Sequence, residues 1–388
     1  MADSAPEPVD APELKSRPRG LVFDVTHHGA VDDGDTESSS GFLAAWKAAC
    51  DHDERATFYV PEEQSVSKIV IRGNLIAPSK LQSFPSKTWI QFSHLNGFSI
   101  TGELDTTNFD GRGAVEAWKQ HSCHSCQHSS RCETLIPSLK FDHVSHGTIK
   151  NVSLSNAKGF HLVIHESSNV NVHNVIVTSP APEDSPNTDG IHVSHSSNIN
   201  ISSSTIEVGD DSVSIIAGSV NVTVYNVTCN CGHGISIGSL GKTKNEEDVS
   251  GISVKKCKIK KTKNGIRIKT WSGSTSSNAS NVTFDDIEMT DVSNPIIIDQ
   301  KYCPNDKCDT SKPSKVKIKD VTFKNVRGTY KSEFAVSLLC SPSVPCENVK
   351  LVDINLTPTH EEDDEDWREG NLNLNGAIDG LKVINSNF

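Results

Sequence analysis

The chain has 388 residues, a formal net charge of −12 and 35% hydrophobic residues, which is the composition of a folded, acidic protein. No run of 18 apolar residues occurs, so we expect no membrane-spanning helix and no membrane partner.

The N-terminal region contains one predicted helix. Residues 1–20 are rich in proline, glutamate and aspartate and contain no apolar segment, so no signal peptide is visible and we expect a flexible segment. From Gly41 to Cys50 apolar residues recur at helical spacing, after Asp35 and three serines that can cap a first turn. We predict a short amphipathic helix that caps the open end of the domain that follows.

A cluster of cysteines and histidines comes next in the chain. Such spacings can ligate zinc, but they match no complete zinc motif. We therefore favour a loop closed by disulfide bonds, with the histidines as bystanders. The members are His121, Cys123, Cys126, His128 and Cys132.

Beyond residue 140 the chain repeats short valine- and isoleucine-rich runs in which apolar positions alternate. The runs start 21 to 34 positions apart, and asparagine and glycine mark the turns. This repeat predicts an all-β fold, a parallel β-helix (solenoid), and a single domain over residues 21–388. An antiparallel sandwich does not explain a repeat sustained for about 200 residues. The runs are 148–152, 169–177, 198–206, 220–227, 251–259, 281–287, 315–323 and 348–356.

Charged residues recur at a similar interval. Asp211 follows Asp189 by 22 positions, and His233 follows Asp211 by another 22. Arg267 and Lys269 lie one longer interval further along. Neighbouring coils of a β-helix are about 4.8 Å apart, so we expect these groups to line one wall of a single cleft.

Asp210 stands directly before Asp211, and adjacent side chains on a regular strand point to opposite faces. Both carboxylates reach one cleft only if the chain bends, which Gly209 permits. An isolated pair of aspartates is usually a turn, but Asp189 and His233 one coil to each side favour a site. Carboxylates in one cleft suit glycoside hydrolysis, in which one is protonated and another is ionised.

A basic stretch runs from Lys255 to Lys269. Alternate lysines on a half-buried strand face solvent, which accounts for most of them without a ligand. Nucleic acid, heparin and an anionic polysaccharide are the alternatives. No set of aromatic residues accompanies the lysines, so we expect no nucleic-acid partner.

Two cysteine pairs predict short disulfide loops, Cys303 with Cys308 and Cys340 with Cys346, which favours an oxidising compartment. The acidic run 361–366 predicts a solvated loop. Seven glycosylation sequons are weak evidence of secretion, because asparagine-rich turns produce some by chance. They begin at Asn151, Asn200, Asn221, Asn226, Asn278, Asn281 and Asn355.

Several segments resemble the polygalacturonases, which are glycoside hydrolases of family 28. Each motif is weak alone, whereas all of them in this order are specific. The resemblance extends from about residue 21 to the end, and residues 294–304, 313–328 and 340–356 are most similar to plant pollen-type exopolygalacturonases. The motifs are Asn187-Thr188-Asp189-Gly190, Gly209-Asp210-Asp211, Gly232-His233-Gly234, Arg267-Ile268-Lys269 and Lys301-Tyr302-Cys303-Pro304.

The resemblance implies a right-handed β-helix that hydrolyses the α-1,4 bonds between galacturonates in pectin with inversion, acting from a chain end and releasing galacturonate. It implies that Asp210 is the general acid and that Asp189 and Asp211 activate the water. His233 would support the protonation of the acid and help to bind sugar.

Four further residues are implied to bind the substrate. Arg267 and Lys269 would take the galacturonate carboxylate, as a planar fork and a point charge. Asn187 and Tyr302 would position the sugar. No cofactor and no metal are implied, and the expected protein is a monomeric plant glycoprotein of pollen that is secreted to the cell wall (apoplast).

The chain departs from the family pattern in several places, including Arg112 in Asp110-Gly111-Arg112-Gly113 and a shortened hairpin near residues 56–72. Ser212 replaces the cysteine that usually follows the paired aspartates, and Cys229-Asn230-Cys231 replaces Cys-Gly-Pro before Gly232. The disulfide bond expected beside the site therefore lacks one partner, which leaves the loop of His233 less constrained. Three alternatives stay open: an endo-polygalacturonase or rhamnogalacturonan hydrolase, a catalytically weak pectin-binding protein, and a lyase that uses calcium or a basic residue.

Overall fold

The structure is a computed structural model, and the chain forms two compact units, residues 1–61 and 62–388. The predicted flexible segment 1–20, the cluster from His121 to Cys132 and the acidic run 361–366 lie outside the described residues. The single domain over residues 21–388 stays a prediction. The described residues are 21–31, 39–51, 56–59, 69–84, 87–115, 117–120, 136–304, 308–359 and 372–381.

The N-terminal unit contains the predicted helix, α1 (Ser39–Cys50), which begins two residues earlier than the sequence suggested. Two parallel strands, β1 (Leu21–Asp24) and β2 (Ala56–Tyr59), accompany it, with a 3-10 turn (Val25–His28) after β1. Val25, Ala30 and Ala45 are buried against one another and against Phe42. The role of α1 as a cap stays a prediction.

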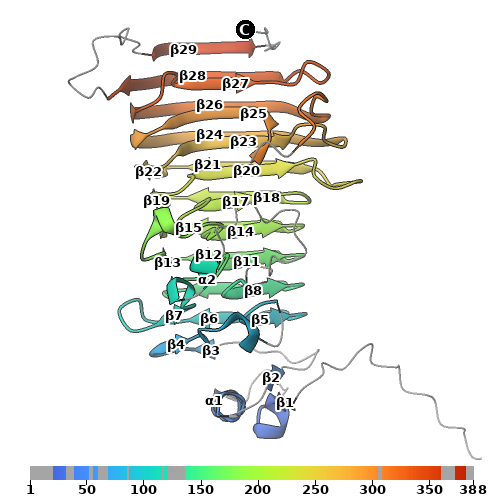
Figure 1. Cartoon of the computed structure of the whole chain (residues 1–388), viewed down its shortest axis with the longest axis vertical. Helices are drawn as coiled ribbons and strands as arrows, with labels where there is room; N and C mark the ends of the chain where they lie inside the picture. The colour runs from blue at the N-terminus through green and yellow to red at the C-terminus, as the bar shows by residue number, and fades with distance from the viewer. Residues whose placement is uncertain are drawn as a thin grey trace, which may run out of the picture. The chain divides into compact units, whose positions relative to one another are not determined.

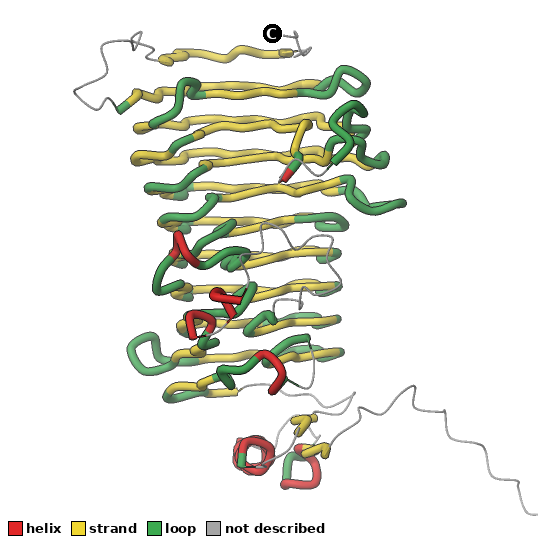
Figure 2. The backbone as a smooth tube through the Cα atoms, in the orientation of Figure 1, coloured by secondary structure: helices red, strands yellow, loops and turns green. Residues whose placement is uncertain are grey.

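The second unit is a right-handed parallel β-helix, as predicted, and Figure 1 shows its coils stacked one upon another. Each coil contributes strands to three parallel ladders, which Figure 2 shows as repeating yellow segments joined by green turns. Ladder 1 is one nine-stranded sheet. Its strands are β5 (Ile90–Ser93), β8 (Leu139–Asp142), β11 (Leu162–His165), β14 (Ile191–Ser194), β17 (Val213–Ile215), β20 (Ile235–Leu240), β23 (Asn264–Trp271), β25 (Asn294–Tyr302) and β27 (Val336–Leu339).

Ladders 2 and 3 form the second large sheet. Ladder 2 contains β3 (Ile69–Val70), β6 (Ser99–Thr101), β9 (Thr148–Lys150), β12 (Ser168–His173), β15 (Ser197–Ser202), β18 (Val220–Tyr225) and β21 (Val249–Lys255). Ladder 3 contains β4 (Asn74–Ile76), β7 (Asn108–Asp110), β10 (Ser153–Ser155), β13 (Ile176–Thr178), β16 (Thr205–Glu207), β19 (Thr228–Asn230) and β22 (Lys258–Lys260). In the last coils the two ladders share the long strands β24 (Ser277–Val292), β26 (Val316–Tyr330) and β28 (Glu347–Pro358), and β29 (Leu372–Leu381) pairs with β28 antiparallel.

From β9 onwards, the turn from ladder 2 to ladder 3 contains one residue with a left-handed backbone, with φ between 51° and 58°. Asparagine and aspartate tolerate this conformation best among residues with a side chain, which explains the asparagines between the repeats. Their side chains also pair between coils, as where Asn174 donates to Asn151 at 2.8 Å. The turn residues are Asn151, Asn174, Ser203, Asn226, Lys256, Asp286, Asn325 and Asp353.

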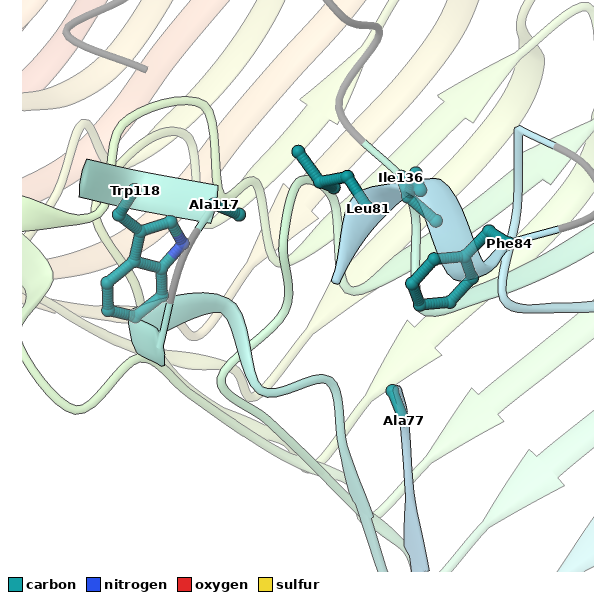
Figure 3. Close-up of a cluster of buried hydrophobic side chains, with 6 residues drawn as sticks. All are labelled: Ala77, Leu81, Phe84, Ala117, Trp118 and Ile136. Carbon is teal, nitrogen blue, oxygen red and sulfur yellow. The ribbon is translucent and has the colours of Figure 1, made fainter. Parts of the chain in front are cut away.

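Alternate residues of all three ladders point inward and form the core. In β24 and β26, for example, Phe284 and Phe323 are fully buried and stack with ring centroids 5.2 Å apart. A smaller buried cluster lies where two 3-10 turns, Leu81–Ser83 and Gly113–Val115, and α2 (Ala117–Gln120) pack on the coils. Figure 3 shows it; it consists of Ala77, Leu81, Phe84, Ala117, Trp118 and Ile136.

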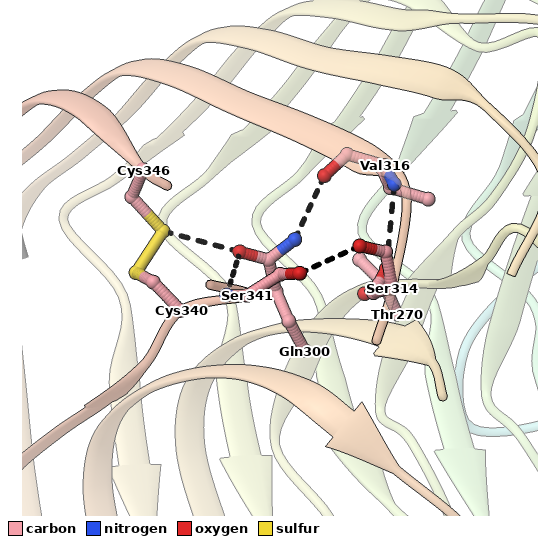
Figure 4. The surroundings of a disulfide bond; sticks show 7 residues. All are labelled: Thr270, Gln300, Ser314, Val316, Cys340, Ser341 and Cys346. Atoms are coloured by element: carbon pink, nitrogen blue, oxygen red, sulfur yellow. Dashed lines mark hydrogen bonds between the residues drawn. A yellow bond between two sulfur atoms is a disulfide. The ribbon is translucent and has the colours of Figure 1, made fainter. Parts of the chain in front are cut away.

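Both predicted disulfide loops are present, Cys303–Cys308 and Cys340–Cys346. The second is tied to the β-helix by buried Gln300, as Figure 4 shows. Gln300 donates to the Val316 carbonyl at 2.7 Å and accepts from the Ser341 amide at 2.9 Å. Within the described part of the chain, no helix has the length and apolarity needed to cross a membrane.

Candidate active site

The turns that lead into ladder 1 carry three of the predicted site residues. In β14 and β17, Ile191 pairs with Val213, and this register continues into β20. Asp189, Asp211 and His233 each stand two residues before these paired positions. The structure therefore places the three residues at equivalent points of adjacent coils.

Asp211 is enclosed by cations, and its side chain is only 3% exposed. It accepts hydrogen bonds from Ser236 Oγ at 2.6 Å, from Arg267 Nη2 at 2.9 Å and from Lys269 Nζ at 2.8 Å. Burial by itself raises the pKa of this carboxyl, but Lys269 and Arg267 outweigh burial and lower the pKa of Asp211 to about 2. Asp211 is therefore ionised in mildly acidic and neutral solution.

Asp210 is the most exposed of the three aspartates, with 21% of its side chain open to solvent. The chain bends at Gly209 and Asp210, as expected for two adjacent carboxylates that face one site. Asp210 Oδ1 contacts His233 Nδ1 at 2.9 Å and accepts from the Asp211 amide at 2.8 Å. Both contacts are to Oδ1, so Oδ2 is the oxygen available to carry a proton.

Asp189 is buried, with a side chain 9% exposed. Burial, followed by the charge of Asp210, raises the pKa of Asp189. Ser214 Oγ donates to Asp189 Oδ2 at 2.7 Å, and His192 Nδ1 lies 2.7 Å from the same Oγ. A hydroxyl has one proton, so His192 Nδ1 is the donor to Ser214. The ring of Phe160 stacks on His192, with centroids 4.6 Å apart.

Three of the predicted sugar-binding residues, Arg267, Lys269 and Tyr302, lie on the adjacent strands β23 and β25 of ladder 1. Lys269 Nζ lies 5.3 Å from the ring centroid of Tyr302, and the ring of Trp271 meets Tyr302 edge-on at 5.5 Å. Arg267 and Lys269 are both paired with Asp211, so they organise this carboxylate as well as presenting positive charge. Asn187 is exposed and has a left-handed backbone, with φ of 54°.

Sequence reasoning missed His192, Ser214 and Ser236. The register places them opposite one another on ladder 1, with Ser236 opposite Arg267. The three follow one another at the same 22-residue interval as Asp189 and Asp211. That shared interval was the signal, but serine and histidine on a half-buried strand carry too little information to be selected by it.

The loop beside the site contains free thiols instead of a disulfide bond. Cys229 and Cys257 are buried, Cys231 is half-buried, and all three are free. Burial raises the pKa of Cys257 to about 11, so this thiol is not reactive at neutral pH. Ser212 Oγ is buried without a hydrogen bond, and the Cys229 thiol is near enough to interact with it.

His233 is nevertheless held firmly by its backbone. Its amide donates to the Asp210 carbonyl at 2.9 Å. The flanking Gly232 and Gly234 have φ of 67° and 72°, and a side chain at Gly234 would collide with the Asn264 carbonyl. Glycine is required here for a close approach between coils, so the loop keeps its shape without the disulfide bond.

The arrangement suits acid–base chemistry on a glycosidic bond more than metal binding. Oxygens of Asp210 and Asp211 and a nitrogen of His233 lie within 4.8 Å of one another, which is a possible cation site. Two cationic side chains already occupy Asp211, however, and repel a metal ion.

Sequence comparison links most of the chain to one family. The model described as Glycosyl hydrolases family 28 matches residues 55–368. An exopolygalacturonase from Arabidopsis thaliana is 40% identical over 357 residues, covering 88% of this chain and 78% of the relative. An exopolygalacturonase from Zea mays is 40% identical over 359 residues, covering 89% and 85%.

Two solved structures share the fold. A hyperthermoactive exopolygalacturonase from Thermotoga maritima superposes with a TM-score of 0.61 and 16% identity, covering 96% of this chain and 97% of that chain. An endo-xylogalacturonan hydrolase from Aspergillus tubingensis has a TM-score of 0.65 and 21% identity, covering 87% and 93%. At these identities the likeness extends to the β-helix and not to the substrate.

Proposed function

Since the chain belongs to family 28 of the glycosyl hydrolases, we propose that it is a polygalacturonase that removes galacturonate from the end of polygalacturonate chains, with inversion. The exo-acting plant relatives at 40% identity support action from a chain end. The observation that carries the proposal is the set of three carboxylates, with Asp211 held ionised by Arg267 and Lys269 beside the more exposed Asp210.

Asp210 is proposed as the general acid. It is the carboxylate that a substrate reaches most easily, and its Oδ2 is free of the contacts that hold Oδ1. Protonated Oδ2 gives its proton to the glycosidic oxygen as the bond to the anomeric carbon breaks. His233 orients the group through Oδ1.

Asp211 and Asp189 are proposed to hold and activate water. Asp211 is ionised because of its two cations, so it accepts a proton from the water that attacks the anomeric carbon. Asp189 lies one coil away and is held by Ser214. The raised pKa of Asp189 makes it the competing candidate for the acid, which a variant pair can decide.

Substrate binding is proposed to depend on the cationic wall. Arg267 and Lys269 attract the galacturonate carboxylate, while Tyr302 and Asn187 position the sugar ring. We propose that the protein acts as a secreted monomer at the plant cell wall, where pectin is found. The two disulfide bonds support an oxidising compartment.

Product analysis tests the proposal. Polygalacturonate incubated with the full chain should release galacturonate monomers only, at the same rate with and without a calcium chelator. A ladder of oligomers would establish endo action, and an unsaturated product that requires calcium would establish a lyase. Asp210→Asn should lower the rate of release by about 10²–10⁴-fold, whereas Asp189→Asn should lower it less if Asp210 is the acid.

A further inference from the structure

A second cluster of ionisable side chains lies away from the carboxylates, at the other end of the ladder 1 strands. β8 ends at Asp142 and is followed by His143, and β11 ends at His165 and is followed by Glu166. Asp142 pairs with His165 in register, so the two turns lie on adjacent coils. None of these residues belongs to a motif of the proposed active site.

The donor atoms of this cluster converge on one carboxylate oxygen. His143 Nε2 lies 2.6 Å from Glu166 Oε2, and His165 Nε2 lies 3.9 Å from the same oxygen. Ligand atoms in a tetrahedral zinc site with bonds of about 2.0–2.1 Å are about 3.3 Å apart, between these two distances. Side chains that are 45%, 30% and 43% exposed, for His143, His165 and Glu166, can make such an adjustment.

Each imidazole turns Nε2 towards Glu166 and Nδ1 towards another oxygen. His165 Nδ1 lies 2.8 Å from Ser194 Oγ, which can accept its proton. His143 Nδ1 lies 3.5 Å from Asp142 Oδ1, an oxygen that is also paired with Lys140 Nζ. Outer acceptors on Nδ1 are what hold the histidine ligands of metal sites in place.

The surrounding charges also suit a cation. Asp142 and Glu166 carry two negative charges, and Lys140, with Nζ 3.1 Å from Asp142 Oδ1, offsets one. The rings of His94, stacked on His143 at 4.6 Å, and of His195, edge-on to His165 at 5.5 Å, restrict both imidazoles.

We propose that His143, His165 and Glu166 bind one divalent transition-metal ion of the zinc class, with Asp142 orienting His143. Two imidazoles and one carboxylate leave a fourth position for water or another oxygen ligand. The site is separate from the catalytic carboxylates, so the metal stabilises the coils of β8 and β11 and takes no part in hydrolysis.

Zinc chloride titrated by calorimetry into the full, tag-free chain at about pH 7.5 tests the proposal, because neutral imidazoles bind the ion. We expect one ion per chain, with affinity lowered at least about tenfold in His143→Ala and in Glu166→Gln, and about tenfold in Asp142→Asn. His173→Ala is the matched control, because His173 also faces a serine hydroxyl, Ser202 Oγ at 3.1 Å, but contacts no carboxylate of the described residues. The zinc affinity of this variant should equal that of the parent.

Thermal unfolding provides a second readout, since an ion that binds only the folded chain raises the unfolding temperature. The zinc-dependent rise should disappear in Glu166→Gln, which also serves as the test if His143→Ala does not fold. Absence of saturable binding would overturn the proposal. So would equal affinity in Glu166→Gln and the parent, or an affinity lowered only by His233→Ala, which would place the ion at the catalytic carboxylates.

Discussion

The two turns of each central coil obey opposite rules. Between ladders 2 and 3 one left-handed residue bends the chain, and Asn174 repeats the backbone geometry of Asn151 and donates a hydrogen bond to it. At the entry to ladder 1, the turns before β14, β17 and β20 carry Asp189, Asp211 and His233, whose surroundings differ from one coil to the next. The uniform turns hold the coils in register, and the register is what aligns the varied turns into a site.

Asp210→Asn, in the turn that enters ladder 1, is the variant with the largest expected effect. It tests whether the varied turns serve catalysis while the uniform turns serve stability. We expect kcat to fall by about 10²–10⁴-fold, because the proton donor to the leaving oxygen is lost. The free energy of unfolding should change little, since the new amide side chain keeps an oxygen for the Asp211 amide and for His233. Initial rates on polygalacturonate and urea unfolding measure the two quantities, and a large loss of stability with unchanged kcat would contradict the division.

The next largest effect is expected for Lys269→Met, which keeps the length of the side chain and removes its charge. With one cation gone, the pKa of Asp211 should rise from about 2 towards its ordinary value. The acidic limb of the pH–kcat/KM profile should then move to higher pH, and kcat/KM should fall by about 10²-fold. Lys263→Met, a lysine of the same basic stretch outside the motif, is the control.

The same variant has a signature in stability. A carboxyl whose folded pKa is depressed adds stability above its unfolded pKa of about 3.9, and this stability is lost as pH falls towards the folded value of about 2. In Lys269→Met this acid-dependent loss should be smaller. Unfolding free energies measured between about pH 5 and pH 2 test the sign.

Ser212→Cys should have a smaller effect, in the direction of stability. The new thiol would stand beside Cys229, and a disulfide bond closing a loop of this length adds about 2–3 kcal/mol. We expect a higher unfolding temperature under oxidising conditions only, with Ser212→Ala as the control. If a thiol assay shows that the disulfide bond has formed and the unfolding temperature still does not rise, the bond strains the loop.

Asn174→Ala probes the uniform turns and should have the smallest effect. Alanine in a left-handed backbone costs about 1–2 kcal/mol, whereas Asn174→Gly avoids this cost while losing the same hydrogen bond to Asn151. The difference between the two variants in urea unfolding isolates the backbone term. Hydrolysis should be unchanged in both, and a loss of activity would show that the register of the site depends on this turn.

The sequence predicted the β-helix and both short disulfide loops, because each rests on a local pattern repeated along the chain. It predicted which carboxylates share a wall, since the interval from Asp189 to Asp211 equals one coil. Turns made by Ser203 and Lys256 escaped prediction, because neither residue type favours a left-handed backbone.

The parts of the site that could not be predicted are contacts between coils. Ser214 and His192 fix Asp189 through hydrogen bonds that depend on rotamers, and no residue type announces them. Likewise, the sequence motif predicts Arg267 and Lys269 as substrate ligands, whereas the structure also shows both paired with Asp211. The spacing of charged residues in the sequence predicts which side chains share the site. Which of them form ion pairs or hydrogen bonds with one another is seen only in the structure.

The antiparallel pairing of β29 with β28 affects whether another chain can extend the stack of strands. A stack of parallel strands ends in unpaired backbone groups that can template the addition of another chain, as in a fibril. β29 covers this end of the coils and runs opposite to β28, so the next layer cannot continue the parallel pattern. β29 therefore ends the parallel stack within one chain, whereas a fibril lengthens by adding further chains and its growth depends on their concentration.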